Sequence, residues 1–82
     1  MIFADTNPVE LSYSKTVPFL ISANLGDVAV EKKLENGNWV AVDGSPVPDG
    51  KTLRIQDHTE GGMIRFTPTA TGTILKFSRI AE

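Results

Sequence analysis

Short turns built on glycine, asparagine and aspartate constrain this chain more than any other feature of its sequence. The pair Asn36-Gly37 separates two segments that alternate apolar and polar residues, 28–35 and 39–42. Such a pair predicts a tight β-hairpin with a type I′ turn, because both central residues of that turn need a positive φ, which glycine adopts freely and asparagine tolerates. Similar turn sequences recur at 43–44, 48–50, 61–62 and 71–72. They divide the second half of the chain into strand-length pieces and leave no stretch long enough for a helix.

The segments between the turns have the alternation and the length of β-strands. In residues 28–35 the even-numbered positions share one face and the odd-numbered positions share the other. We expect about seven strands, at residues 10–13, 17–22, 28–35, 39–42, 52–55, 63–67 and 74–80. This spacing predicts an all-β domain, a small antiparallel β-sandwich or barrel of the immunoglobulin-like or jelly-roll-like kind. The sequence leaves sandwich and barrel open, and it predicts that the proline-rich segment 45–48 crosses between sheets.

The length of the chain indicates one domain with a small core. A chain of 82 residues buries only about 60–65% of its unfolded surface. Small domains usually need an additional source of stability, and a chain with no cysteine has neither disulfides nor thiolate metal sites. Oligomerisation or docking onto a partner remains, and we expect a homo-oligomer.

Residues 1–8 are a candidate N-terminal arm ahead of a single β-sandwich domain at 9–82. Ile2 and Phe3 are the apolar residues that could anchor this arm, to the same domain or to a neighbour. The segment lacks the basic region and the long apolar core of a secretory signal, so we interpret it as mature sequence made in the cytoplasm. No apolar run approaches membrane-spanning length, and no membrane partner is expected.

Residues that carry enzyme chemistry are sparse in this chain. The single histidine, His58, lies in a polar stretch with Asp57 and Glu60. Tetrahedral zinc sites use several His or Cys ligands, so a polar turn between two strands is the better interpretation of this stretch. With one imidazole and no Gly-x-Ser-x-Gly motif, no serine has the neighbouring base that a nucleophile needs. We therefore expect no enzymatic activity, no metal and no cofactor.

Two binding functions would require aromatic residues at the surface. Binding of single-stranded nucleic acid uses a basic stripe interleaved with aromatic residues, and a chain with a pI near 5.3 is a poor candidate. No nucleic-acid partner is therefore expected. Carbohydrate binding uses an exposed aromatic platform, which Trp39 and Tyr13 could supply on one face of a sandwich. Packing is the simpler role for both rings, and we expect Trp39 in the core.

Two segments share a pattern with a known group of proteins. The first is a charged strand, a glycine turn and a Trp-Val-x-Val strand at 28–44, and the second is a Gly-x-x-Arg-Phe-like strand at 61–66. Together they resemble small β-sandwich modules in virion proteins of tailed bacteriophages. The resemblance implies a capsid decoration or cement protein, a head fibre, or an accessory domain of a tail protein. It assigns no site, because the matching residues lie at turn and core positions.

Composition and resemblance together favour a non-enzymatic structural subunit of a phage particle. Its partner would be the major capsid protein or another virion protein, and it would be assembled in the host cytoplasm and reside in the virion. It would stabilise the shell by burying apolar arm residues against its neighbours, with Ile2 and Phe3 as our candidates. The alternative is an immunoglobulin-like adhesion or carbohydrate-binding module that uses Trp39 and Tyr13 against sugar rings.

Overall fold

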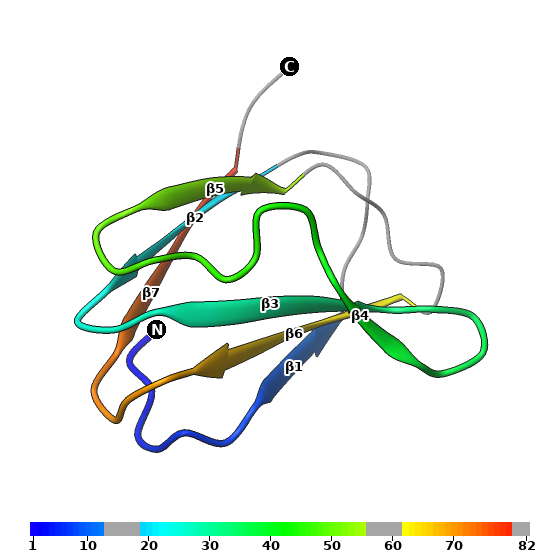
Figure 1. Cartoon of the computed structure of the whole chain (residues 1–82), viewed down its shortest axis with the longest axis horizontal. Helices are drawn as coiled ribbons and strands as arrows, with labels where there is room; N and C mark the ends of the chain where they lie inside the picture. Colours follow the sequence, from blue (N-terminus) through cyan, green and yellow to red (C-terminus); the bar gives the residue numbers. More distant parts are fainter. Residues whose placement is uncertain (13–18, 56–61, 80–82) are drawn as a thin grey trace.

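The described part of the chain is a two-layered β-structure (Figure 1). The computed structural model describes residues 1–12, 19–55 and 62–79, and these ranges contain seven strands and no helix. The strands are β1 (Val9–Ser12), β2 (Phe19–Asn24), β3 (Val28–Lys33), β4 (Trp39–Ala41), β5 (Thr52–Ile55), β6 (Met63–Pro68) and β7 (Ile74–Arg79). They form one antiparallel sheet in the order β1-β6-β3-β4 and a second in the order β5-β2-β7. The fold is a small β-sandwich, which confirms the predicted class and decides against a barrel.

The order of the five central strands matches that of immunoglobulin domains. Strands β2 and β5 pair as strands B and E do, and β4, β3 and β6 lie side by side as C′, C and F do. The first and last strands exchange sheets: β1 pairs with β6, and β7 pairs with β2. In an immunoglobulin domain the first strand pairs with B and the last with F. The proline-rich segment 45–48 lies between β4 and β5 and crosses between the sheets, as predicted.

The core lies between the two sheets and is made by the side chains that face inward on each strand. On β3 the alternation buries Val28 and Val30, and on β6 it buries Ile64 and Phe66. The ring of Phe66 packs edge-to-face against Phe77 of β7, with 5.4 Å between the ring centroids. In the part of the chain that the structure describes, the buried hydrophobic residues are Phe3, Ile21, Ala23, Val28, Val30, Val42, Val47, Ile55, Ile64, Phe66 and Leu75.

The β3–β4 hairpin has a three-residue loop, so the predicted type I′ turn is wrong. The N–H of Leu34 donates to the Asn38 carbonyl over 2.8 Å, and the N–H of Gly37 donates to the Leu34 carbonyl over 2.9 Å. This is the pattern of a type I turn followed by a bulge at Gly37, whose φ is 88°. Asn36 keeps a negative φ, and its side-chain Oδ1 accepts a hydrogen bond from the N–H of Asn38 over 3.0 Å. The longer loop needs a positive φ at the glycine alone.

Beyond β4 the chain leaves β3 and returns to it. The N–H of Val42 donates to the Val30 carbonyl over 3.1 Å, and Val47 then exchanges two hydrogen bonds with Val28, of 2.8 and 2.9 Å. Between these contacts, the N–H of Val30 donates to the hydroxyl Oγ of Ser45 over 2.9 Å. A serine side chain therefore occupies the place of a strand carbonyl where the backbone bulges away from β3.

Candidate functional site

Residues 1–3 run antiparallel alongside the start of β7, at the edge of the three-stranded sheet, and Ile2 forms an isolated β-bridge with Ile74. The amino group of Met1 donates to the Leu75 carbonyl over 2.7 Å, and the N–H of Leu75 donates to the Met1 carbonyl over 2.8 Å. The N–H of Phe3 donates to the Thr73 carbonyl over 2.9 Å. We call residues 1–3 the N-terminal edge. The candidate arm is thus attached to its own domain through these three residues.

The two residues expected to bind a partner point in opposite directions on this edge. Phe3 belongs to the core, with 3% of its surface exposed, whereas Ile2 is 71% exposed. Ile2 lies opposite Ile74 of β7 in an antiparallel bridge. This alternation is the ordinary behaviour of successive residues in a strand. Ile2 is therefore the residue of the pair that is available at the surface.

Leu25, in the turn between β2 and β3, is a second exposed apolar residue near the N-terminal edge. It follows Asn24, which pairs with Ile74 in the β2–β7 ladder. Its φ is 64°, and it is the one non-glycine residue with a positive φ in the described ranges. Its N–H lies 3.1 Å from Oδ1 of Asn24 and 3.0 Å from Oδ1 of Asp49, and its carbonyl accepts a hydrogen bond from Thr73 Oγ1 over 3.2 Å.

The left-handed conformation of Leu25 was not predictable from the turn signal at 24–27. That signal favours asparagine or glycine for the left-handed position, and both flank Leu25. The position falls on the leucine because Asn24 is still paired in β2. The glycine of this turn is needed at position 26 for a separate reason, because a Cβ on Gly26 would collide with Thr73 Oγ1. The result is a leucine side chain that is 63% exposed in a conformation that leucine rarely adopts.

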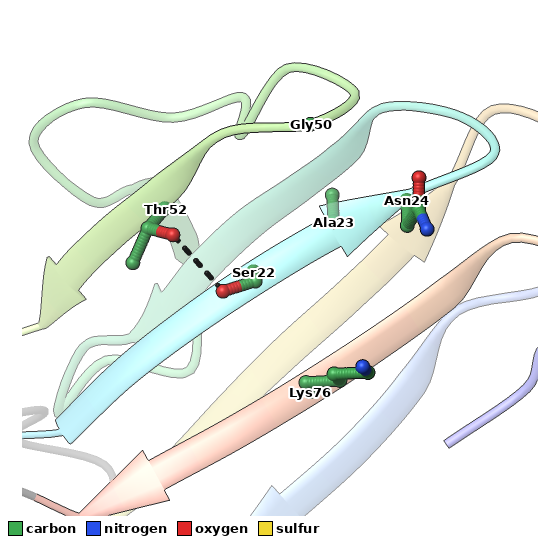
Figure 2. Close-up of a pocket in the computed structure, with 6 residues that line it drawn as sticks. All are labelled: Ser22, Ala23, Asn24, Gly50, Thr52 and Lys76. Carbon is green, nitrogen blue, oxygen red and sulfur yellow. Dashed lines mark hydrogen bonds between the residues drawn. The ribbon is translucent and has the colours of Figure 1, made fainter.

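A polar hollow of about 320 Å³ lies on the outer face of the three-stranded sheet (Figure 2). Figure 2 shows Ser22, Thr52 and Lys76 on the three neighbouring strands of this sheet. The hydroxyls of Ser22 and Thr52 share a hydrogen bond of 3.0 Å. Both Thr52 and Lys76 are exposed, and among the described residues no buried side-chain nitrogen or oxygen lacks a hydrogen-bond partner. Its walls can hold water or a small polar molecule, but they select no particular ligand.

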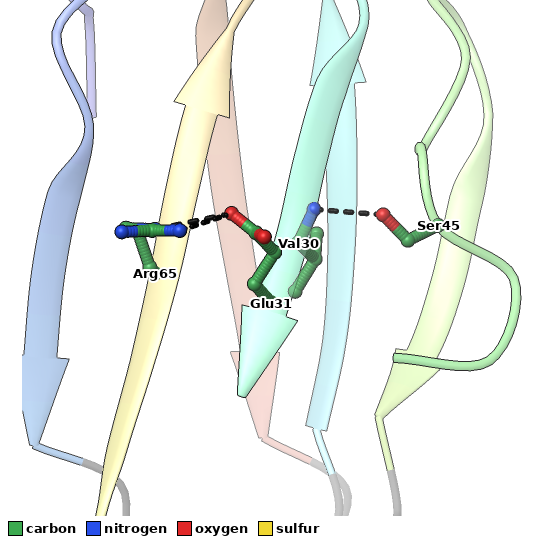
Figure 3. A network of polar contacts seen from close by, with 4 residues as sticks. All are labelled: Val30, Glu31, Ser45 and Arg65. Carbon is green, nitrogen blue, oxygen red and sulfur yellow. Dashed lines mark hydrogen bonds and ion pairs between the residues drawn. The ribbon is translucent and has the colours of Figure 1, made fainter. Parts of the chain in front are cut away.

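Trp39 lies half-buried on the outer face of the four-stranded sheet, which corrects the expectation that it lies in the core. The guanidinium carbon of Arg65 is 4.4 Å from the centroid of the Trp39 ring, and Nζ of Lys33 is 5.9 Å from it. Both Nε and Nη2 of Arg65 donate to Oε1 of Glu31, over 3.0 and 2.8 Å (Figure 3).

Strand register explains why Trp39 faces outward. Trp39 pairs with Lys33, and Arg65 pairs with Glu31, so all four residues project from the same face of the sheet. Val28 and Val30 occupy the opposite face of β3 and fill the core. Arg65 covers part of the Trp39 ring, so the ring is not an open platform for a sugar.

Two groups named from the sequence lie outside the described residues: Tyr13, the second aromatic of the sugar-binding alternative, and the stretch 57–60 with His58. Within the described ranges, no group of three or more His, Cys, Asp or Glu residues is placed to hold a metal ion. The same ranges contain no helix that is long and apolar enough to cross a membrane.

No protein-family model matches the chain, and no curated protein or solved structure is significantly similar to it. On the surface of the described domain, the N-terminal edge is the strongest candidate for a binding site.

Proposed function

We propose that the chain is a structural subunit that binds other protein subunits in a virus particle, as a capsid decoration or cement protein does. The observation that supports this most is the apolar surface at the N-terminal edge. Met1 is 44% exposed, Ile2 71% and Leu25 63%. Pairing of Ile2 with Ile74, and of Ile74 with Asn24, brings these residues to one end of the same sheet. Exposed apolar residues that gather in one place are typical of protein-protein contact sites.

Binding through this edge would stabilise a particle by a simple mechanism. Each apolar side chain that leaves water at the contact contributes about 25 cal/mol per Å² of buried apolar surface. A ligand that binds only the assembled state shifts the equilibrium toward that state by mass action. A small domain repeated many times on a shell therefore raises the stability of the whole assembly. The resemblance of residues 28–44 and 61–66 to virion β-sandwich modules supports the same function.

The proposal is tested by following the protein through a density gradient of particles from the virus whose genome encodes it. A C-terminally tagged chain should sediment with intact capsids. A double variant, Ile2→Asn with Leu25→Asn, should remain at the top of the gradient, because it removes the two most exposed large apolar side chains of the described residues. The control Val40→Thr changes an exposed valine on the other sheet and should sediment with capsids as the wild type does. Wild-type protein that stays at the top of the gradient would contradict the proposal.

The sugar-binding alternative is tested by tryptophan fluorescence. The chain contains one tryptophan, so its fluorescence reports on Trp39 alone. A glycan that stacks on this ring should displace Arg65 and change the emission. Such a change, together with no sedimentation with capsids, would favour the carbohydrate-binding module over the structural subunit.

A further inference from the structure

The sheet edges of the described structure differ in how well they are protected against pairing with another chain. Natural proteins protect edge strands with prolines, charged side chains and short strand length. Strand β1 follows Pro8 and carries Glu10, β5 follows Lys51 and carries Arg54, and β4 has only three residues. The N-terminal edge, Met1-Ile2-Phe3, contains neither a proline nor a charged side chain. It is the least protected of these four edges.

The backbone N–H and carbonyl of Ile2 point away from the domain. Met1 and Phe3 direct their N–H and carbonyl groups toward the start of β7, where Met1 bonds to Leu75 and Phe3 bonds to Thr73 and Gly72 just before the strand. Successive residues of a strand direct these groups to opposite sides. The N–H and carbonyl of Ile2 therefore face outward, and within the described residues neither makes a hydrogen bond. One donor and one acceptor on the same residue are thus available to an incoming strand.

We propose that the N-terminal edge pairs with the same edge of a second copy of this chain, with Ile2 directly opposite Ile2 of the other copy. In an antiparallel pair of this kind, the two facing residues exchange both of their N–H···O=C bonds. The two three-stranded sheets and their N-terminal edges would become one continuous sheet across the dimer. The inference uses the surface on which the proposed function rests, but it concerns self-association alone and does not require a virus particle.

A second copy fits this edge because the contact is self-complementary. In a twofold-symmetric pair with Ile2 opposite Ile2, the same short segment of both copies meets. A charged segment would therefore face a segment of the same charge. The first charged side chain along the chain is Asp5, outside the paired segment, and the positively charged amino group of Met1 is directed to the Leu75 carbonyl of its own chain. Ile2 already lies opposite Ile74 on the outer face. Pairing would therefore make a row of four isoleucines, Ile74 and Ile2 from each copy, that covers the most exposed apolar side chain of the described residues.

The first test blocks the backbone of Ile2 while the domain stays intact. Ile2→Pro removes the outward N–H, which makes no hydrogen bond to any of the described residues, so the domain keeps all of the backbone bonds between residues 1–3 and β7. Its thermal unfolding in dilute solution should match that of the wild type. In sedimentation equilibrium of the full chain, the dissociation constant of the dimer should rise about 30-fold for the loss of two net hydrogen bonds. The conservative variant Ile2→Val keeps both backbone groups and an apolar side chain, and it should dimerise as the wild type does.

The second test identifies which residues face each other. The chain has no cysteine, so a single introduced cysteine is an unambiguous reporter. Facing residues in a hydrogen-bonded antiparallel pair have Cα atoms about 5.5 Å apart, within the range that a disulfide spans. Ile2→Cys should therefore form a disulfide-linked dimer under mild oxidation. Thr71→Cys, in an exposed turn, should stay largely monomeric under the same conditions.

Each outcome decides the proposal. A wild-type dimer that Ile2→Pro dissociates and that Ile2→Cys links supports it. A wild-type chain that stays monomeric up to about 1 mM, where self-association would be too weak to matter, overturns it. A dimer that Ile2→Pro leaves unchanged also overturns it, because the contact would then lie elsewhere. Sedimentation with capsids is measured separately, so a monomer that still binds capsids would refute this inference and leave the proposed function standing.

Discussion

The hydroxyl of Ser45 completes the hydrogen bonding of β3 at the point where the chain bulges away from that strand. Figure 3 shows Ser45 reaching the N–H of Val30, a residue that is fully buried. A buried N–H without a partner is costly, because it has lost its hydrogen bonds to water. The serine side chain therefore has a structural role that its exposed neighbours in the connector do not share.

Replacing this serine should destabilise the domain measurably. Ser45→Ala leaves the Val30 N–H without a partner and should lower the free energy of unfolding by about 1–3 kcal/mol. Urea denaturation followed by circular dichroism measures the change. The control Ser78→Ala, at an exposed position of β7, should stay within about 0.5 kcal/mol of the wild type. Equal effects of the two substitutions would show that the Ser45 hydroxyl is not needed by β3.

At Leu25 we predict a gain in stability. The left-handed conformation costs a side chain with a Cβ roughly 1–2 kcal/mol, and asparagine tolerates it better than leucine does. Because the leucine side chain is largely exposed, Leu25→Asn loses little burial. We expect the free energy of unfolding to rise by up to about 1 kcal/mol, measured by the same denaturation. A loss of stability would mean that Leu25 packs against its own domain, and it would weaken the case for Leu25 as a contact residue.

At the scale of elements, two consecutive residues of the N-terminal edge have different roles. Phe3 belongs to the core, and Ile2 lies outside it. Phe3→Ala should therefore cost about 3–5 kcal/mol, the usual loss for a buried phenylalanine. Ile2→Ala should stay within about 0.5 kcal/mol when measured in dilute solution. If both substitutions had small effects, residues 1–3 would not be held against β7, and the N-terminal edge would not exist as described.

At the scale of the whole molecule, local pattern predicted the strands well. Residues 52–55 coincide with β5, and the turn sequences separated the remaining strands to within a few residues. Local pattern predicted the pairing of β3 with β4 through the hairpin, but not the β3–β6 and β2–β7 ladders, which join segments far apart in the sequence. The contact between Arg65 and the Trp39 ring depends on the β3–β6 pairing. A single alternating strand does not show that Arg65, on another strand, will lie over its ring.

The candidate site was only partly predictable for the same reason. Ile2 and Phe3 stood out as apolar residues near the N-terminus, but sequence alone did not separate the buried residue from the exposed one. That distinction depends on the hydrogen bonds between residues 1–3 and β7. The direction of the Ile2 backbone, on which self-association depends, also follows from this register. The burial of Phe3 and the direction of the Ile2 backbone groups both depend on contacts between distant segments, so no single segment of the sequence predicts them.

The most direct test of pairing through the N-terminal edge is amide hydrogen exchange at Ile2 and Phe3, measured by NMR over a range of protein concentrations. The N–H of Phe3 is bonded to Thr73 and should be protected at every concentration. The N–H of Ile2 faces outward, so it should exchange freely in dilute solution and become protected as the chain is concentrated and the edges pair. An Ile2 amide that exchanges freely at every concentration would contradict pairing through this edge. An Ile2 amide that is already protected in dilute solution would show that the edge is covered by its own chain.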